Sequence, residues 1–344
     1  MARKIDWDSQ IGRRLKLRDL HVFSTVVECG SMAKAAQHLG VTTPAVSEVI
    51  GDLEHALGVR LLDRVAQGIE PTIYGDALLK RSVAAFDELK QSIRDIEFLS
   101  DATSGEVRIA CTDALCYTLL PEIILRFSEQ YPRVGVHIDV TGNWWGYPGL
   151  RERKYDCILH RPALSLAQEP AIDDLNVESL DDLNVESLLD DTVVVAAGAD
   201  SRWARRRKID LAELTDEQWI LGAPDTWHRA TAVEIFRAQG LSVPEPRITT
   251  VSIPFRARLL AASPYLTMFA TSVLRQLIAD HYAVTALPVD LPANPSSLRV
   301  VTLKNRTLSS VVERFLACVR EVAASLETKQ GRRALARSSK SKVC

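Results

Sequence analysis

"LGVTTPAVSEVIGDLEHALG", residues 39–58, predicts a tight turn followed by an amphipathic helix. Thr42 stands where an N-cap is needed, and Pro44 is tolerated in the first turn because a backbone N–H there would have no helical partner. Four aliphatic residues at helical spacing form the predicted buried face: Val46, Ile50, Leu53 and Leu57. The first turn also offers small hydroxyl side chains, which raises the question of what surface this helix contacts.

Two shorter helices precede this one, and a hairpin follows it. Residues 19–30 carry apolar side chains at helical spacing and end at a glycine, and a second helix begins at Ser31. Residues 58–72 are typical of a short two-stranded wing. We therefore predict a three-helix unit with a wing over residues 1–71.

A long linker helix is predicted within residues 72–103. Its apolar residues recur at seven-residue intervals at Leu79, Phe86 and Ile93. Two more apolar residues, Leu89 and Ile96, fill the neighbouring positions of the same stripe. Such a stripe needs a partner surface. Two partners remain open, because the helix could pack against its own domain or pair with the same helix of a second copy.

Residues 104–327 alternate between strand and helix patterns, which is typical of parallel βαβ units and predicts an α/β fold class with two lobes. The predicted strands span residues 106–112, 134–140, 155–160, 192–197, 219–223, 248–253, 265–270 and 298–303. The pattern leaves open whether the chain crosses between the lobes once or twice.

Two segments stand outside this alternation. The tandem repeat DDLNVESL-DDLNVESL at residues 173–188 is too short for a repeat architecture, so we interpret it as a duplication in a surface loop. Residues 328–344 contain basic side chains and no acidic ones, which predicts a disordered tail with a weak contact to nucleic acid.

Composition indicates a globular protein. Its 344 residues are 47% hydrophobic and 25% charged, enough for two or three units with buried cores. The formal net charge of −2 creates no strong electrostatic field around the whole protein, so an anionic partner must bind through a local part of the surface. Neither a signal peptide nor a membrane span is indicated, and the six cysteines show no pairing rhythm. We expect a cytoplasmic protein.

Enzyme motifs are missing from the sequence. It contains no Gly-x-Ser-x-Gly, no P-loop, no His-Glu-x-x-His and no double Cys-x-x-Cys. We therefore predict a protein that is not an enzyme, with no cofactor and no metal site.

The spacing of residues 17–75 resembles the LysR-type transcriptional regulators, and the likeness extends over roughly residues 17–325. It rests on many ordered positions, among them Leu17, Asp19, Leu20, Phe23, Gly30, Ser31, Ala35, Ala36, Leu39, Thr42, Pro44, Ala45, Val46, Ser47, Ile50, Leu53, Glu54, Leu57, Gly58, Arg64, Pro71, Thr72 and Gly75. The resemblance implies a winged helix-turn-helix domain, a dimerising linker helix, and a two-lobed effector domain similar to periplasmic binding proteins.

By this likeness, the start of the third helix enters a DNA major groove. A helix N-terminus offers free amides to phosphate, and small hydroxyls reach base edges without clashing. The candidate DNA contacts are Ser31, Thr42, Thr43, Pro44, Ser47, Glu48 and Arg64. Ser31 and Thr42 have a second interpretation as helix caps.

The sequence departs from the family where positive charge is usual. Glu48 follows Ser47 in place of a basic or amide residue, and the wing carries Gln67 and Glu70. Residues 1–72 hold nine Lys or Arg against nine Asp or Glu. We therefore expect modest, salt-sensitive DNA binding with an unusual base preference.

Effector candidates follow from the rule that ligands of α/β lobes lie beyond the carboxyl ends of strands, near helix starts. Thr112 is the strongest, because the family usually presents a hydroxyl there. The predicted set is Thr112, Asp113, Asn143, Trp144, His160, Arg161, Thr226, Trp227, His228, Ser252 and Phe255. Aromatic rings beside His and Arg predict a small anionic effector, with Trp144 or Trp227 available to stack on a ring.

Several of these residues have alternatives. Trp144 fits hinge packing, His228 a surface cap, and Arg161 an ion pair with a carboxylate. Cys111 and Cys116 suggest an alternative function as a thiol-based redox sensor, although buried cysteine is more often a small apolar residue.

The resemblance also implies partners. They are double-stranded DNA with a partly palindromic operator, a small-molecule effector, RNA polymerase, and further copies of the chain in a homodimer or homotetramer. Effector binding is expected to favour one subunit arrangement and so to change the DNA bend.

Overall fold

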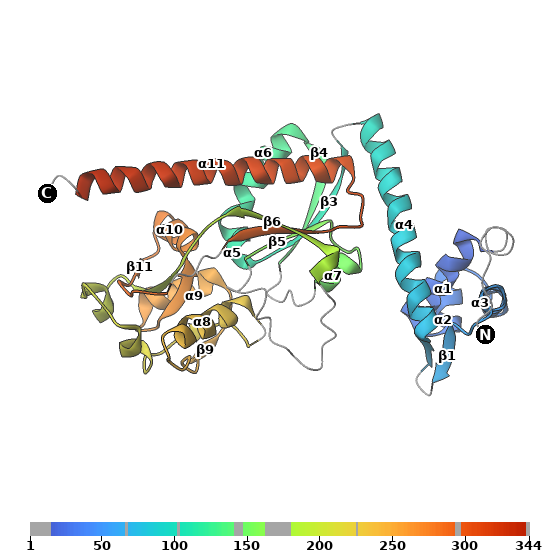
Figure 1. Ribbon diagram of the computed structural model, residues 1–344, viewed down its shortest axis with the longest axis horizontal. Coiled ribbons are helices and arrows are strands. Elements are labelled where there is room, and N and C mark those ends of the chain that lie inside the picture. The colour runs from blue at the N-terminus through green and yellow to red at the C-terminus, as the bar shows by residue number, and fades with distance from the viewer. Residues whose placement is uncertain are drawn as a thin grey trace. The chain divides into compact units, whose positions relative to one another are not determined.

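The computed structural model describes residues 15–65, 68–101, 104–140, 147–161, 180–224, 226–292 and 297–341, with side chains beyond Leu326 left out (Figure 1). The chain divides into two compact units, Met1–Ser92 and Ile93–Cys344. None of the helices in the described ranges is long and apolar enough to cross a lipid bilayer.

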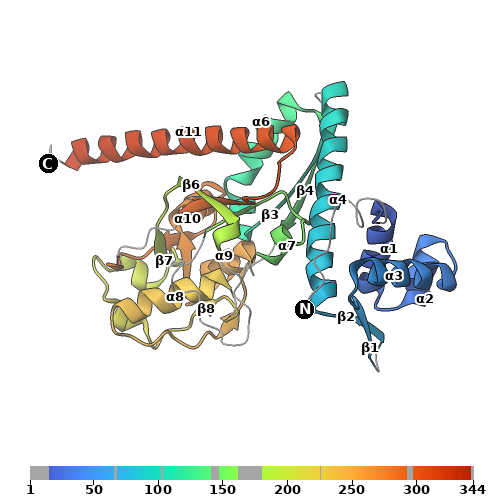
Figure 2. The same ribbon diagram turned by 45° about the vertical axis from the view of Figure 1, so that its right-hand side comes forward.

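The first unit is a three-helix bundle with a wing (Figure 2). It contains α1 (Leu17–Cys29), α2 (Met32–Leu39), α3 (Thr43–Leu57), the hairpin β1 (Leu62–Val65) and β2 (Gly68–Pro71), and most of α4 (Ile73–Ser100). Its core contains the predicted apolar face of α3 together with Phe23, Val26, Ala35, Ala36 and Leu61. The predicted helices and wing are confirmed.

The junction between the wing and α4 explains part of the spaced motif. Thr72 Oγ1 donates to the Arg60 carbonyl (2.8 Å) and accepts from the Gly75 N–H (3.1 Å), which starts the long helix. A Cβ atom on Gly75 would clash with the Leu61 carbonyl oxygen. Glu54 Oε1 accepts from the Leu61 N–H (2.8 Å) and ties α3 to the wing.

The apolar stripe of α4 is packed against a core at its start and exposed farther along the helix. Leu79 packs against the core of the first unit. Farther along, Leu89, Ile93 and Ile96 are exposed by 44%, 57% and 63%. Packing within the chain therefore accounts for the start of the stripe and leaves its second half on the surface.

The second unit begins within α4. Arg94 Nη1 lies 3.5 Å from Asp156 Oδ1, and Arg306 Nη2 lies 2.9 Å from the same oxygen. Asp95 Oδ1 accepts from the backbone N–H of Ser310, at the start of the helix α11 (2.9 Å). These contacts fasten the end of α4 to the rest of the second unit.

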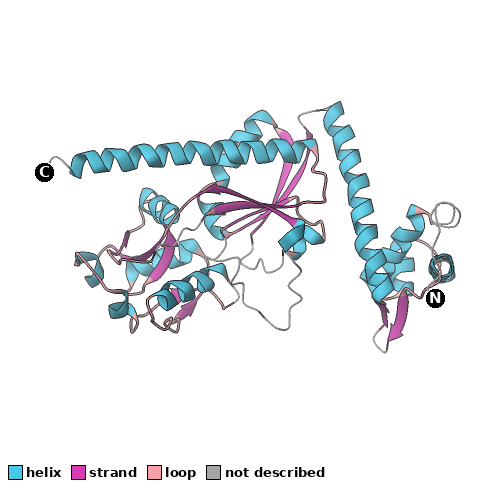
Figure 3. Ribbon diagram, in the orientation of Figure 1, coloured by secondary structure: helices cyan, strands magenta, loops and turns pink. Residues whose placement is uncertain are grey.

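The first lobe is a mixed five-stranded sheet (Figure 3). Its order is β4-β3-β5-β12-β6, formed by β3 (Ser104–Cys111), β4 (Arg133–Val140), β5 (Cys157–His160), β6 (Leu183–Leu189) and β12 (Leu298–Leu303). Its core contains side chains of α6 (Leu120–Gln130) and α11 (Ser310–Ser341), and the short helices α5 (Asp113–Tyr117) and α7 (Pro148–Arg151) complete the lobe.

The second lobe is built around the three-stranded sheet β10-β7-β11. Its strands are β7 (Val193–Gly198), β10 (Thr267–Ala270) and β11 (Val284–Ala286), beside the pair β8 (Ile220–Leu221) and β9 (Ile248–Thr249). Its helices are α8 (Trp227–Ala238), α9 (Ile253–Ala262) and α10 (Thr271–Ala279), with 3-10 turns at Arg202–Arg205 and Leu211–Leu214. The chain crosses between the lobes twice, after β6 and after β11.

The prediction of parallel strands is only partly correct. The β3–β4, β3–β5 and β8–β9 pairs are parallel, whereas β7 pairs antiparallel with β10 and β11, and β12 pairs antiparallel with β5 and β6. About seventy residues separate β7 from β10, and local periodicity carries no information on pairing over that separation.

The loop interpretation of the tandem repeat was wrong for its second copy. Residues 180–182 form a 3-10 turn, and Leu183–Leu189 forms the edge strand β6 against β12. Both Leu183 and Leu189 are buried, and the latter packs in the core of the first lobe. The first copy lies outside the described residues, apart from its last residue.

The disorder predicted for residues 328–344 was also wrong for most of that segment. The backbone of α11 remains helical to Ser341, and residues 342–344 lie outside the described part. Helix-forming Ala, Leu, Arg, Lys and Gln dominate this stretch and no proline interrupts it, which favours continuation of the helix.

We expect one copy of the repeat to be sufficient for β6. Deleting residues 173–180 yields the same chain as deleting residues 181–188, so the thermal unfolding midpoint should stay unchanged. By contrast, Leu189→Asp places a carboxylate in the core and should lower the free energy of unfolding by roughly 3 kcal/mol or more. Val185→Asp, at an exposed position of the same strand, is the matched control. Equal destabilisation by both substitutions in urea titrations would contradict the assignment.

Candidate functional site

The first turn of α3 presents an exposed polar face. Thr42 is the N-cap, and its Oγ1 accepts from the Ala45 N–H at 3.4 Å. The side chains of Thr43, Ser47 and Glu48 are exposed, as is Pro44, while the opposite face of the helix is buried. The predicted surface therefore exists, and Thr42 acts as a cap while remaining accessible.

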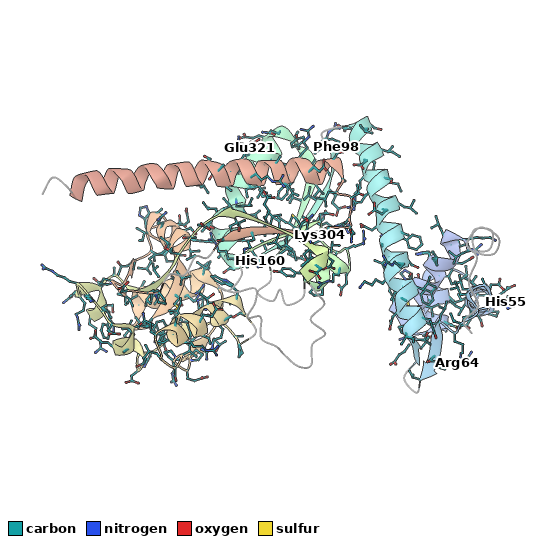
Figure 4. All side chains as sticks on the ribbon, viewed as in Figure 1. His55, Arg64, Phe98, His160, Lys304 and Glu321 are labelled. Atoms are coloured by element: carbon teal, nitrogen blue, oxygen red, sulfur yellow. The ribbon has the colours of Figure 1, made fainter. Side chains whose placement is uncertain are left out.

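The other two predicted DNA contacts flank this turn. Ser31 is the half-buried N-cap of α2 and its side chain makes no capping hydrogen bond, so the capping interpretation fails there. Arg64 is exposed on β1, opposite Ile69 in the hairpin register (Figure 4). Gln67 lies outside the described residues.

A small cavity of about 110 Å³ lies between the lobes of the second unit. Thr112, Asp113, Ala114 and Val140 line it from the first lobe; the second lobe contributes Thr226, Trp227, His228, Val251 and Arg256. Five of the eleven predicted effector residues are thus brought together. The first turns of α5 and α8 meet there, as the rule for strand ends and helix starts predicts.

Arg256 supplies the positive charge among the residues that line this cavity, which also include Asp113. Its guanidinium is buried and donates to the carbonyls of Val251 (3.1 Å) and Met268 (3.0 Å) and to Thr267 Oγ1 (3.3 Å). Burial lowers the pKa of Arg256 to about 9, and the Asp113 carboxylate opposes this shift. Among the described residues no carboxylate forms an ion pair with it, so its positive charge is held mainly by neutral oxygens.

His228 supports Arg256 as a neutral imidazole. Its Nδ1 accepts from the Gly222 N–H (2.9 Å), and its Nε2 lies 2.9 Å from the Met268 carbonyl oxygen and 2.6 Å from Arg256 Nη1. Burial, aided by the adjacent positive charge of Arg256, lowers the pKa of His228 to about 3. The surface-cap alternative for His228 was therefore wrong.

Three further donors line the cavity without a partner. Thr112 Oγ1, Trp227 Nε1 and Arg256 Nε are buried and have no hydrogen-bond partner in the described part of the chain. Buried polar groups are rarely left unsatisfied in native proteins. All three atoms belong to residues that line the cavity, which makes it the candidate position for a polar ligand.

Four predicted effector residues lie elsewhere. Ser252 and Phe255 are exposed at the start of α9, and His160 is buried at the end of β5, with its Nε2 3.0 Å from the Tyr147 hydroxyl (Figure 4). Arg161 is buried against Asp191 at 3.2 Å, as its ion-pair alternative predicted. Position along the chain placed them near strand ends, but these contacts direct them away from the cavity. Asn143 and Trp144 lie outside the described residues.

The helix α5 links the two lobes at the edge of the cavity. Asp113 Oδ2 accepts from the Ile253 N–H at the start of α9 (2.9 Å). The Tyr117 hydroxyl donates to Asp280, and Ala114 packs with Tyr117 against the core of the second lobe. This five-residue helix follows a strand of the first lobe yet makes side-chain contacts with the second.

Comparisons with known proteins match both units. Residues 17–76 match the model "Bacterial regulatory helix-turn-helix protein, lysR family", and residues 100–324 match the model "LysR substrate binding domain". The chain belongs to the LysR family. It is a LysR-type transcriptional regulator with a helix-turn-helix unit and an effector-binding domain.

Relatives of this LysR-type regulator are themselves regulators. GbpR of Azospirillum brasilense is 26% identical over 322 residues, covering 94% of this chain and 90% of that protein. TdcA of Escherichia coli K12 is 26% identical over 277 residues, covering 80% and 84%. These relatives are named as transcriptional regulators, which are not enzymes.

Solved structures share the fold of the LysR-type regulator. A full-length OxyR variant from Pseudomonas aeruginosa aligns with a TM-score of 0.60 at 16% identity, covering 90% of this chain and 94% of that one. HinK from Pseudomonas aeruginosa aligns with a TM-score of 0.51 at 23% identity, covering 89% and 98%.

Arg256 is the residue that sequence reasoning missed. A signal was present, because it shares a buried helical face with Ile253, Ala257 and Leu260. A lone arginine at a core position of an amphipathic helix requires an internal partner or a ligand.

No group of three or more His, Cys, Asp or Glu side chains in the described residues could hold a metal ion.

The buried histidines should make the LysR-type regulator acid-sensitive. The pKa values of His160 and His228 fall to about 3 in the fold, mainly through burial, whereas an unfolded histidine titrates near 6.5. As pH falls below 6.5, only the unfolded chain takes up these protons, so folding loses up to about 1.4 kcal/mol per pH unit per histidine.

Urea titrations at pH 7.5 and 5.5 measure this loss. We expect His228→Gln to reduce the difference in the free energy of unfolding between pH 7.5 and pH 5.5. The substitution His55→Gln, at an exposed position, should leave that difference unchanged. If His228 were already charged in the folded protein, the wild type and His228→Gln would show the same difference in the free energy of unfolding between the two pH values.

Proposed function

We propose that this LysR-type regulator is controlled by a small carboxylate bound between the lobes. The observation that carries the proposal is the buried Arg256 guanidinium, which lacks an ion pair with a described carboxylate and lies beside unpartnered donors of Thr112 and Trp227. A buried charge without a counter-ion is costly, and a carboxylate would provide both charge and acceptors.

The volume of the cavity limits the effector further. About 110 Å³ lies well below the roughly 300–1,000 Å³ of ordinary sites for drug-sized ligands. This favours a short aliphatic carboxylate over the aromatic effector that the tryptophans suggested. Trp227 then acts through its indole N–H more than through its ring face.

For DNA, we propose that the exposed first turn of α3 reads a major groove. Thr43 and Ser47 would contact bases or phosphates, Thr42 and Pro44 would shape the turn, and Glu48 would accept from a cytosine amine. Ser31 and Arg64 would contact the backbone at either side. The exposed apolar residues of α4 support pairing of two copies on a partly palindromic operator.

The same proposal covers the cellular setting. The protein would act in the cytoplasm as a homodimer or homotetramer, and its effector would change the subunit arrangement and the recruitment of RNA polymerase. Such coupling requires the effector to bind the two arrangements with different affinity.

A second candidate function is thiol-based redox sensing through Cys111 and Cys116. One observation favours it: their Sγ atoms lie 3.0 Å apart. The hydrogen bond between the two sulfurs raises the pKa of Cys111, which is also buried, and lowers the pKa of the half-buried Cys116. Cys116 is therefore the thiol more readily ionised.

Removing the positive charge of Arg256 should weaken anion binding strongly. We expect titration calorimetry with acetate to show binding to the wild type, and Arg256→Met to weaken it by about a hundredfold, the loss typical of a charged hydrogen-bonding partner. Thr112→Val should weaken it about tenfold. Arg258→Met, on the exposed face of the same helix, is the matched control. Equal acetate affinity in all four proteins would place the anion elsewhere.

The DNA-reading surface can be tested on fragments that the protein selects from its own genome. Ser47→Ala and Thr43→Ala should each weaken the affinity for the selected fragment by about tenfold, as measured by fluorescence anisotropy. Glu48→Arg should change the base preference and steepen the salt dependence. His55→Ala, near the far end of α3, is the control. Unchanged affinity for all operator variants in Glu48→Arg would show that this side chain faces away from DNA.

A further inference from the structure

We propose that Cys111 and Cys116 form a reversible disulfide that weakens anion binding in the cavity between the lobes. This inference rests on the proposed function, because it assigns a regulator to the same cavity. It combines the two candidate functions in one device, in which an oxidant opposes a carboxylate effector.

The two sulfurs enclose the first-lobe wall of the cavity. Cys111 ends β3 and Cys116 lies in the last turn of α5, and the segment between them contains Thr112, Asp113 and Ala114, all of which line the cavity. A bond between the sulfurs would close a short ring around these residues. Any change in the shape of that ring acts directly on the donor of Thr112.

The contact between the sulfurs is suited to oxidation. At 3.0 Å the two Sγ atoms need to approach by only about 1 Å to reach bonding distance. Cys116 is half-buried and so accessible to a small oxidant, whereas Cys111 is fully buried. The half-buried Cys116 sulfur would react first, and the buried Cys111 sulfur would then close the bond.

Hydrogen peroxide is the oxidant class that fits this arrangement. The Cys116 thiolate attacks one peroxide oxygen, the O–O bond breaks, and the products are a sulfenic acid and hydroxide. The Cys111 sulfur then attacks the Cys116 sulfur, the S–O bond breaks, and the thiol proton leaves with the hydroxyl group as water. Two thiols lose two electrons, and one peroxide gains them. A dithiol reductant reverses the change.

Closing the bond would move α5 toward the first lobe. In the reduced protein, α5 contacts the second lobe through the Asp113–Ile253 hydrogen bond, the Tyr117–Asp280 hydrogen bond and the packing of Ala114. Drawing Cys116 toward β3 pulls against all three contacts. Loss of the Asp113 contact frees the start of α9, which carries Arg256, so the anion loses its aligned donors.

A peptide map of the full-length protein tests the bond. Trypsin cleaves after Arg108 and Arg126, so both cysteines lie in one peptide, residues 109–126. After peroxide treatment and alkylation, we expect this peptide to lose two hydrogens and take up no alkylating agent, and dithiothreitol to restore both sites. A cross-link to the peptide that contains Cys157, the neighbouring buried cysteine on β5, would overturn the assignment.

Acetate titration of the reduced and oxidised proteins tests the coupling. We expect oxidation to weaken acetate binding by about tenfold in the wild type and in Cys29→Ser, within the usual range of coupling between sites. Cys116→Ser should bind acetate like the reduced wild type with or without peroxide. Cys111→Ala provides a second variant if the serine protein fails to fold, as judged by circular dichroism.

The outcomes separate the two proposals. A disulfide that forms without changing acetate affinity overturns the coupling and leaves the anion site standing. Failure of the reduced wild type to bind acetate overturns the anion site and the coupling together. Absence of the disulfide at complete oxidation of Cys116 overturns the coupling alone.

Discussion

The burial of one positive charge organises the effector domain of this protein. Arg256 projects from α9 into the second lobe, where its hydrogen bonds reach the segment before α9 and the strand β10. Burial, aided by the charge of Arg256, keeps His228 of α8 neutral beside it. Described carboxylates leave that charge without an ion pair, which is the basis of the proposed anion site.

The helix α5 lies at the edge of the same cavity and connects the two lobes. Its side chains bind the second lobe, while its backbone continues directly from a strand of the first. An anion held by Arg256 and Thr112 would add to these contacts and favour the closed arrangement. If the proposed anion binds there, lobe closure and anion binding would favour each other.

A second buried network connects the first lobe to the linker helix. Asp156 lies just before β5, accepts from the Arg108 N–H (2.8 Å), and is paired with Arg306 and Arg94. The last turns of α4 are thus held by the same carboxylate that holds the centre of the sheet. The helix-turn-helix unit, in contrast, has a separate apolar core that contains none of these charged residues.

The sequence alone determined the local features of the protein: the helices and wing of residues 17–71, the caps, the long linker helix, and most strands of the effector domain. These depend on periodicity and on residues such as Gly30, Thr42 and Gly75, whose effects act over a few neighbours. It also identified Thr112, Trp227 and His228, because strand ends and helix starts locate cavities in α/β lobes. Only the tertiary structure decided the pairing of β7, the strand role of the second repeat copy, the burial of Arg161 against Asp191, and the role of Arg256. Each of these depends on partners many residues away along the chain, and the free energy of burying a charge or a strand edge is set by those partners and not by its neighbours in sequence.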